Sequence, residues 1–118
     1  MATIREIKLT GSKSDDARLI CSVHGKLTDF ASGSIVVRVQ QGACYNLLVV
    51  CEGKAGNEAS VEIEAVHRDC KLMGCSEDGQ PGTRGFEKLT AKIPANEITA
   101  LALDRFAVVV VAKPGNAK

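Results

Sequence analysis

The sequence has few aromatic residues, and this restricts what it can bind. It contains three Phe, one Tyr and no Trp, at Phe30, Tyr45, Phe86 and Phe106. Proteins that hold single-stranded nucleic acid stack its bases on aromatic rings, and sugar binders commonly use the same flat faces. The 15 basic and 14 acidic residues leave a net charge of +1, which is too small to attract a polyanion. We therefore expect no nucleic-acid partner.

The sequence also lacks long apolar runs. None approaches the roughly 20 residues that a membrane-spanning helix needs. The first residues, MATIREIKLTG, are charged from Arg5 onward and lack the apolar stretch of a signal peptide. We therefore expect a cytoplasmic protein without membrane contact, whose five cysteines are reduced thiols.

The length and composition are typical of one globular domain, 1–118. The chain has 118 residues, of which 45% are hydrophobic and 25% charged. A chain of this length buries about two thirds of the surface that it exposes when unfolded. It should therefore fold without disulfides or metal.

Short segments of alternating apolar residues predict β-strands. The predicted strands are 3–10, 18–24, 34–40, 45–52, 60–67, 86–93, 98–103 and 106–112. Segments 34–40 and 45–52 are expected to form a hairpin, and Asp104 and Arg105 a turn before the last strand. Ile98, Leu101 and Ala102 also have helical spacing, but the short length and the β-rich neighbours favour a strand at 98–103.

These patterns predict an all-β protein. Seven to nine short strands, spaced about ten residues apart without intervening helices, are typical of an antiparallel β-sandwich, Ig-like or jelly-roll-like. Residues 68–85, RDCKLMGCSEDGQPGTRG, break the pattern and predict a long irregular loop. Long loops in compact domains are usually functional or disordered, so this is the natural place for a site.

One group of residues has the chemistry of a metal site. His67, Cys70 and Cys75 form an H-x2-C-x4-C pattern, and imidazole and thiolate are the ligands that zinc prefers. A structural zinc site needs four ligands, and the fourth could be Cys44, Cys51 or His24. In the alternative interpretation His67 extends the inward face of its strand and the cysteines act as small hydrophobic residues. The paired C-x2-C pattern of many zinc proteins is absent.

The remaining cysteines have simpler interpretations. Cys21 and Cys51 are in phase with inward-facing apolar residues, which predicts core packing. Cys44, in the loop of the expected hairpin, is predicted to be exposed and is a candidate reactive thiol. In an oxidising compartment, Cys70 and Cys75 could form a disulfide.

No known catalytic motif is present. The sequence lacks G-x-S-x-G, G-x-x-x-x-G-K-[ST] and H-E-x-x-H. Glu62 and Glu64 lie on one face of a predicted strand, about 7 Å apart. Paired carboxylates can hydrolyse glycosidic bonds, but a solvated sheet face explains this pair more simply. We therefore predict no catalytic residues.

Residues 93–103, IPANEITALAL, resemble the proline-asparagine corner of the small β-sandwich that closes many glycoside hydrolases. The match covers about a tenth of the chain. The resemblance implies a strand corner in a β-sandwich and, for function, a carbohydrate-associated module. No catalytic residue is carried over.

The leading hypothesis is a non-catalytic binding or assembly module, a small structural or accessory protein with a protein partner or self-association. The valine run 108–111 would mediate self-association if its strand lay at a sheet edge. In a central strand it would instead need cover from a second sheet. The alternatives are a metal protein or enzyme with its site in 67–85, with zinc as the candidate cofactor, and the carbohydrate-associated module.

Overall fold

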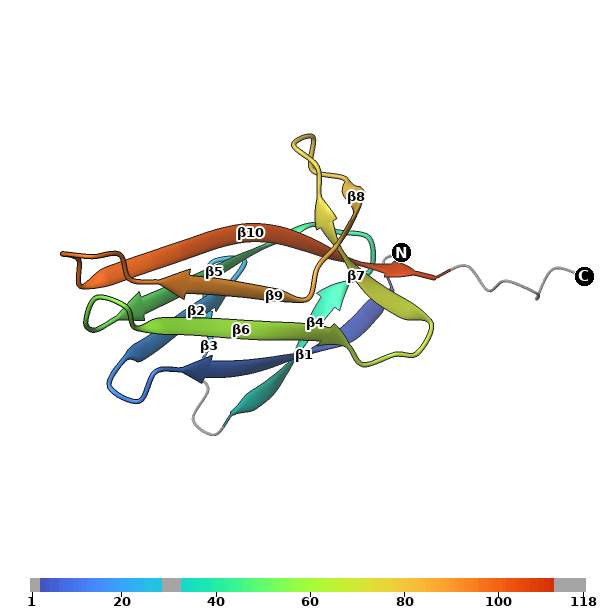
Figure 1. Ribbon diagram of the computed structural model, residues 1–118. Coiled ribbons are helices and arrows are strands. Elements are labelled where there is room, and N and C mark those ends of the chain that lie inside the picture. Colours follow the sequence, from blue (N-terminus) through green and yellow to red (C-terminus); the bar gives the residue numbers. More distant parts are fainter. Residues whose placement is uncertain (1–2, 29–32, 112–118) are drawn as a thin grey trace, which may run out of the picture.

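The computed structural model describes residues 3–28 and 33–111, and shows two antiparallel sheets packed against each other (Figure 1). One sheet has the strand order β4 (Ser34–Gln40), β1 (Ile4–Lys13), β6 (Glu58–Ala65), β9 (Lys88–Lys92). The other has the order β3 (Lys26–Thr28), β2 (Arg18–Val23), β5 (Tyr45–Glu52), β10 (Thr99–Val110), β7 (Cys70–Cys75), β8 (Pro81–Gly85).

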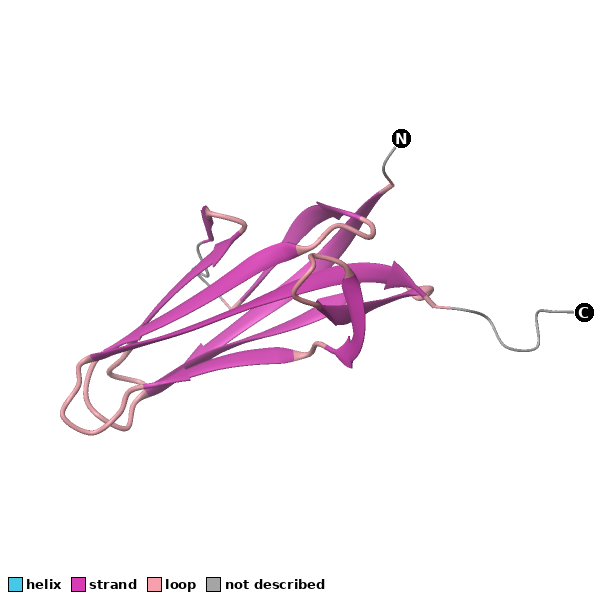
Figure 2. Cartoon of the chain, turned by 90° about the horizontal axis from the view of Figure 1, so that it is seen from above, coloured by secondary structure: helices cyan, strands magenta, loops and turns pink. Residues whose placement is uncertain are grey.

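The predicted all-β sandwich is confirmed. The described residues form ten strands, a little more than the seven to nine expected, and no helix (Figure 2). In this part of the chain there is accordingly no helix long and apolar enough to cross a membrane. Phe30, and Ala112 at the end of the last predicted strand, lie outside the described residues.

The core lies between the two sheets and follows the alternation of the sequence. Ile7 and Leu9 of β1 face Leu47 and Val49 of β5 across it, and all four side chains are fully buried. Phe106 of β10 stands among them, with its ring centroid 6.0 Å from that of Tyr45 and 5.8 Å from that of Phe86. Burying an apolar side chain of this size stabilises the fold by about 1.5–3 kcal/mol, so these rows hold the sheets together.

The expected hairpin of 34–40 and 45–52 is wrong, although both strands have the predicted bounds. β4 pairs with β1 in one sheet, whereas β5 pairs with β2 and β10 in the other. The connection between them therefore crosses from sheet to sheet. The physical reason is that β5 carries apolar residues on both faces, which suits a central strand, whereas β4 alternates and suits an edge.

The predicted turn at Asp104 and Arg105 is also wrong. Thr99–Val110 is one continuous strand, which confirms the strand at 98–103 from Thr99 onward. Both polar side chains are satisfied within it, because Asp104 forms an ion pair with Arg84 (3.2 Å) and Arg105 donates to the Ser76 carbonyl (2.9 Å). β10 lies between β5 and β7, so the valine run is central.

Residues 68–85 are not the irregular loop that was predicted. They contain β7 and β8, which pair through a register shift between Met73 and Cys75. The hairpin rises above β10 in Figure 1. The segment lacks visible alternation because Leu72, Met73 and Gly74 are buried in succession.

Backbone hydrogen bonds connect the chain segments at both ends of the sandwich. Residues 94–96 form the corner between β9 in one sheet and β10 in the other, where Glu97 N–H donates to the Pro94 carbonyl (3.2 Å). At the opposite end, Gln41 N–H donates to the Thr3 carbonyl and Gly42 N–H to the Val108 carbonyl, each at 2.8 Å. The first strand therefore begins, and the last strand ends, at the same end of the sandwich.

Candidate functional site

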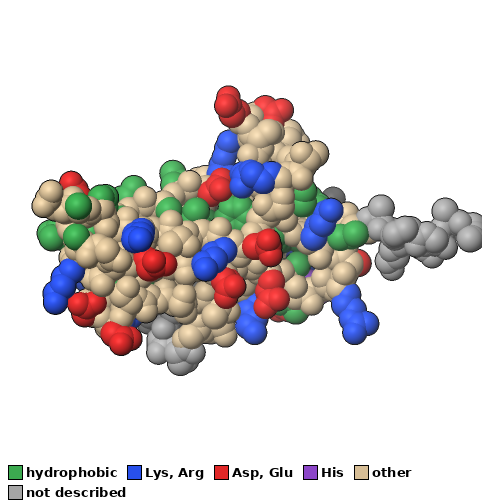
Figure 3. All heavy atoms as spheres, in the orientation of Figure 1, with side chains coloured by type: hydrophobic (Ala, Val, Ile, Leu, Met, Phe, Trp, Pro, Cys, Tyr) green, Lys and Arg blue, Asp and Glu red, His purple; other side chains and the backbone are tan. Residues whose placement is uncertain are grey.

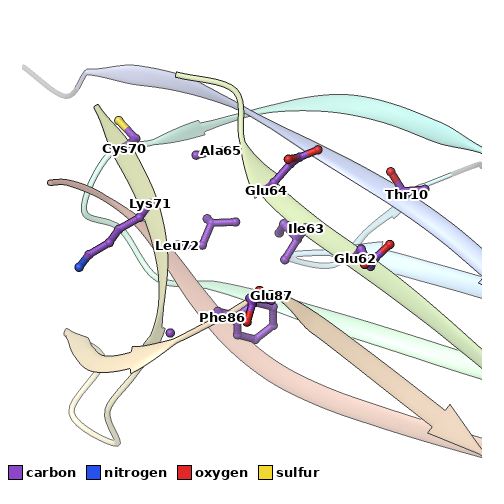
Figure 4. A pocket seen from close by; sticks show the side chains of 11 residues that line it. Thr10, Glu62, Ile63, Glu64, Ala65, Cys70, Lys71, Leu72, Phe86 and Glu87 are labelled. Carbon is purple, nitrogen blue, oxygen red and sulfur yellow. The ribbon is translucent and has the colours of Figure 1, made fainter. Parts of the chain in front are cut away.

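A cleft opens between β6 and β7, along one side of the sandwich (Figure 4). Its volume is about 480 Å³. Ile63 and Leu72 lie on either side of it, with Phe86 at its floor, and all three belong to the buried core. Four charged side chains stand around it: Glu62, Glu64, Lys71 and Glu87.

The side chains that line the cleft include few reactive groups. Its lining contains the glutamate pair considered above, Glu62 and Glu64, but no histidine. Its one thiol is that of Cys70, whose pKa is raised by burial. A thiol with a raised pKa remains protonated at neutral pH and is a weak nucleophile. The glutamates lie on the exposed face of β6, as a solvated sheet face predicts.

The three predicted zinc ligands are not brought together. Cys70 and Cys75 stand at opposite ends of β7, about 17 Å apart for five residue steps of a strand. His67 lies in the turn before β7, where its carbonyl accepts a hydrogen bond from Cys70 N–H (3.1 Å). Within residues 3–28 and 33–111, no three side chains of His, Cys, Asp or Glu gather closely enough to hold a metal ion.

The cysteines are not all reduced. Cys44 and Cys75 form a disulfide, with their Cα atoms 6.3 Å apart. The prediction of five thiols, and of Cys44 as a reactive one, is therefore wrong. The pairing of Cys70 with Cys75 is wrong as well. Cys44 and Cys75 are 31 positions apart. They meet because β5, which Cys44 precedes, and β7 are the two neighbours of β10. Cys21 and Cys51 are fully buried, as predicted.

The most unusual surface is the outer side of the six-stranded sheet, and the position of Phe106 creates it. Side chains alternate along a strand. Because Phe106 and Val108 face the core, so do Ala100 and Ala102. The larger residues of the same stretch, Leu101 and Leu103, are therefore turned outward, where they are 67% and 65% exposed.

The neighbouring strands extend these leucines into a patch. Leu101 is paired with Val50, which is paired with Ile20. In the next row, Leu103 is paired with Leu48, and Ser22 connects Leu48 to Leu27, which is 75% exposed. We call this surface the apolar face, and it consists of Ile20, Leu27, Leu48, Val50, Leu101 and Leu103.

Charged residues and the β7–β8 hairpin border the apolar face. Beyond the row of Leu101 lie Arg18 and Glu52, which form an ion pair at 3.6 Å. Beyond the row of Leu103 lies Arg105. Further along β10, Ala107 and its partner Met73 are buried although they do not belong to the core. The sheet is thus covered at the hairpin and open over the leucines.

The outer side of the four-stranded sheet is different in kind. Lys8 of β1 lies between Glu64 and Val36, and Thr10 is paired with Glu62, which is paired with Lys88. Figure 3 shows acidic and basic side chains over β6, whereas hydrophobic side chains line the margin above the first half of β10. One outer face therefore has the charged surface of a solvated sheet and the other does not.

No family model, curated protein or solved structure matches the chain.

Proposed function

We propose that the protein is a non-catalytic binding and assembly module, which holds another protein against its apolar face. One observation carries this proposal: three leucines of that face, Leu27, Leu101 and Leu103, are each at least 65% exposed in adjacent rows of one sheet. Contiguous exposed apolar surface with a polar rim is typical of protein interaction sites.

The chemistry of the face favours a protein over other ligands. Its six side chains are aliphatic and it contains no aromatic ring, so it lacks the flat stacking surface that sugars and bases use. The surface is an open sheet face and not a closed pocket, so it suits the broad surface of a protein better than a small ligand. Covering one exposed leucine contributes about 1.5–3 kcal/mol to the free energy of binding. Two or three leucines therefore supply most of the binding free energy of a weak protein complex.

A pair of variants tests the proposal. Wild-type protein and the double variant Leu101→Ser/Leu103→Ser are immobilised and exposed to an extract of the cells that make the protein. We expect the wild type to retain a defined protein that the variant loses. Val36→Ser is the matched control, because Val36 is 56% exposed on the opposite outer face. Retention of the same proteins by wild type and double variant would contradict the proposal.

A further inference from the structure

We propose that the protein held on the apolar face is a second copy of this chain, packed face to face about a two-fold axis that runs across the strands. The inference rests on the proposed function and names its partner. Three features of the face carry it: its rows are self-complementary, its bordering charges are of opposite sign, and its area fits a reversible dimer.

The rows of the face match each other when the face is turned over. The row of Leu101 and Val50 lies next to the row of Leu103 and Leu48. A two-fold axis that runs between these rows exchanges them in the second copy. Leu101 then lies against Leu103 of the second copy, and Val50 against Leu48 of the second copy. Packed sheets normally align their strands within about 30°, which keeps these contacts in place.

The charges that border the face are complementary under the same axis. Glu52 of β5 lies one row beyond Leu101, and Arg105 of β10 lies one row beyond Leu103. Within its own chain Glu52 uses Oε1 for the ion pair with Arg18 (3.6 Å), which leaves Oε2 for a second cation. The axis brings Glu52 of one copy beside Arg105 of the second copy, twice per dimer. Arg105 uses one nitrogen for the Ser76 carbonyl, and a guanidinium has further donors for a carboxylate. The net charge of +1 adds little repulsion between copies.

The size of the face sets the expected strength of the dimer. Four strands about 4.8 Å apart, and six residue steps of about 3.3 Å, give a flat footprint of roughly 400 Å². Side-chain relief increases the buried area, but it remains at or below the roughly 800 Å² per partner of standard stable interfaces. We therefore expect a weak, concentration-dependent dimer and not a permanent one.

Sedimentation velocity on the full chain tests the inference. The measured mass should rise from that of one chain at low micromolar concentration toward that of two near millimolar concentration. Leu101→Ser/Leu103→Ser should weaken the dimer at least tenfold, and Val36→Ser should leave it unchanged. Circular dichroism and urea midpoints show that each variant is folded. An unchanged dimer in the leucine variant would overturn the inference.

Charge reversal tests the two-fold arrangement itself. Glu52→Arg and Arg105→Glu should each weaken the dimer severalfold, because each places like charges together. The combined variant Glu52→Arg/Arg105→Glu restores opposite charges and should recover most of the loss. A dimer that both single variants weaken and the combined variant does not recover would overturn the arrangement.

A wild-type protein that is monomeric at every concentration also overturns the inference, and the immobilised variants then decide the fate of the proposed function. If the wild type still retains another protein that Leu101→Ser/Leu103→Ser loses, the apolar face binds a different partner and only the second copy is excluded. If neither retains a protein, both proposals fail.

Discussion

The three cysteines outside the disulfide are enclosed by the core, and burial decides their chemistry. Cys21, Cys51 and Cys70 are all buried. Burial raises the pKa of the Cys21 thiol to about 11, and it raises the pKa of Cys51 and Cys70 in the same direction. A buried thiolate would lack solvation, so all three remain neutral at physiological pH and contribute to packing.

The raised pKa of Cys21 predicts a loss of stability in alkali. In the unfolded chain the thiol ionises near pH 9, whereas in the folded protein it stays protonated up to about pH 11. The unfolded state binds fewer protons between these values, so the free energy of unfolding should fall as the pH rises from 9 to 11. Urea denaturation at a series of pH values measures this fall. Cys21→Ala should make it shallower, and equal slopes in both proteins would refute the assignment.

Two leucines at different depths should respond differently to the same change. Leu47 is fully buried, whereas Leu27 is 75% exposed. Leu47→Ala leaves a cavity and should lower the free energy of unfolding by about 2–5 kcal/mol. Leu27→Ala should change it by less than about 0.5 kcal/mol at protein concentrations where the chain is monomeric. Urea denaturation compares the two, and similar costs would mean that the burial pattern is wrong.

At the level of elements, the Cys44–Cys75 disulfide ties β7 to the start of β5, so that β10 lies between two linked strands. A cross-link stabilises a fold mainly by restricting the unfolded chain, and closing a loop of 31 positions contributes about 3.7 kcal/mol. The β7–β8 hairpin has only β10 as a further neighbour in its sheet, so it depends most on this link.

Reduction of the disulfide should therefore lower the free energy of unfolding by about 3.7 kcal/mol. Hydrogen exchange should increase first in β7 and β8. Cys44→Ser should reproduce the effect without a reductant, and a reductant should then have no further effect on that variant. Cys70→Ala is the control, since it removes a thiol and keeps the disulfide. If reductant leaves the wild type unchanged in both measurements, the link is not formed in solution.

The corner between β9 and β10 depends on Asn96, whose φ of 68° is left-handed. Asparagine and glycine tolerate this conformation, whereas in other residues it costs conformational free energy. Asn96→Ala should lower the free energy of unfolding by about 1 kcal/mol, and Asn96→Gly should be nearly neutral. Ala95→Gly, at a neighbour without positive φ, controls for the flexibility of glycine itself. The opposite ranking of the two Asn96 variants in thermal unfolding would contradict this role.

Strands with an alternating or a continuous apolar pattern were predictable from the sequence, whereas β7 and β8 were missed. The bounds of β4 and β5 follow from their apolar pattern alone, and the corner at 94–96 follows from Pro94. β7 was missed because it is buried on both faces around Gly74. Strand pairing was not predictable, because the choice between β1 and β5 as neighbour of β4 depends on the whole molecule.

The candidate site was less predictable than the fold, for a specific reason. In the segment TALAL the larger residues would be expected to face the core, yet the alanines do. The signal lies several residues further on, because Phe106 and Val108 fix which side of a continuous strand is inside. The predicted turn at Asp104 separated TALAL from Phe106 and Val108. The outward orientation of Leu101 and Leu103, and with it the apolar face, was therefore not predicted. The Cys44–Cys75 pair was missed because it depends on strand order.

For the whole molecule, the sheet topology sets how it folds. Every described strand except β3 and β8 pairs with at least one strand that is not its neighbour in the sequence, and β1 cannot complete its pairing before β6 is in place. Folds dominated by such distant pairings fold slowly, in milliseconds to seconds. Stopped-flow refolding from urea should show this range for the oxidised protein, and microsecond folding would contradict it.

The common end at which β1 begins and β10 ends has a mechanical consequence. A force applied between Ile4 and Val110 pulls on two different sheets from one pole of the sandwich. The interstrand hydrogen bonds run perpendicular to the strands, so they are stressed one after another from that pole and not all together in shear. As part of a chain under tension, this sandwich would unfold at low force, because its interstrand hydrogen bonds would break one at a time.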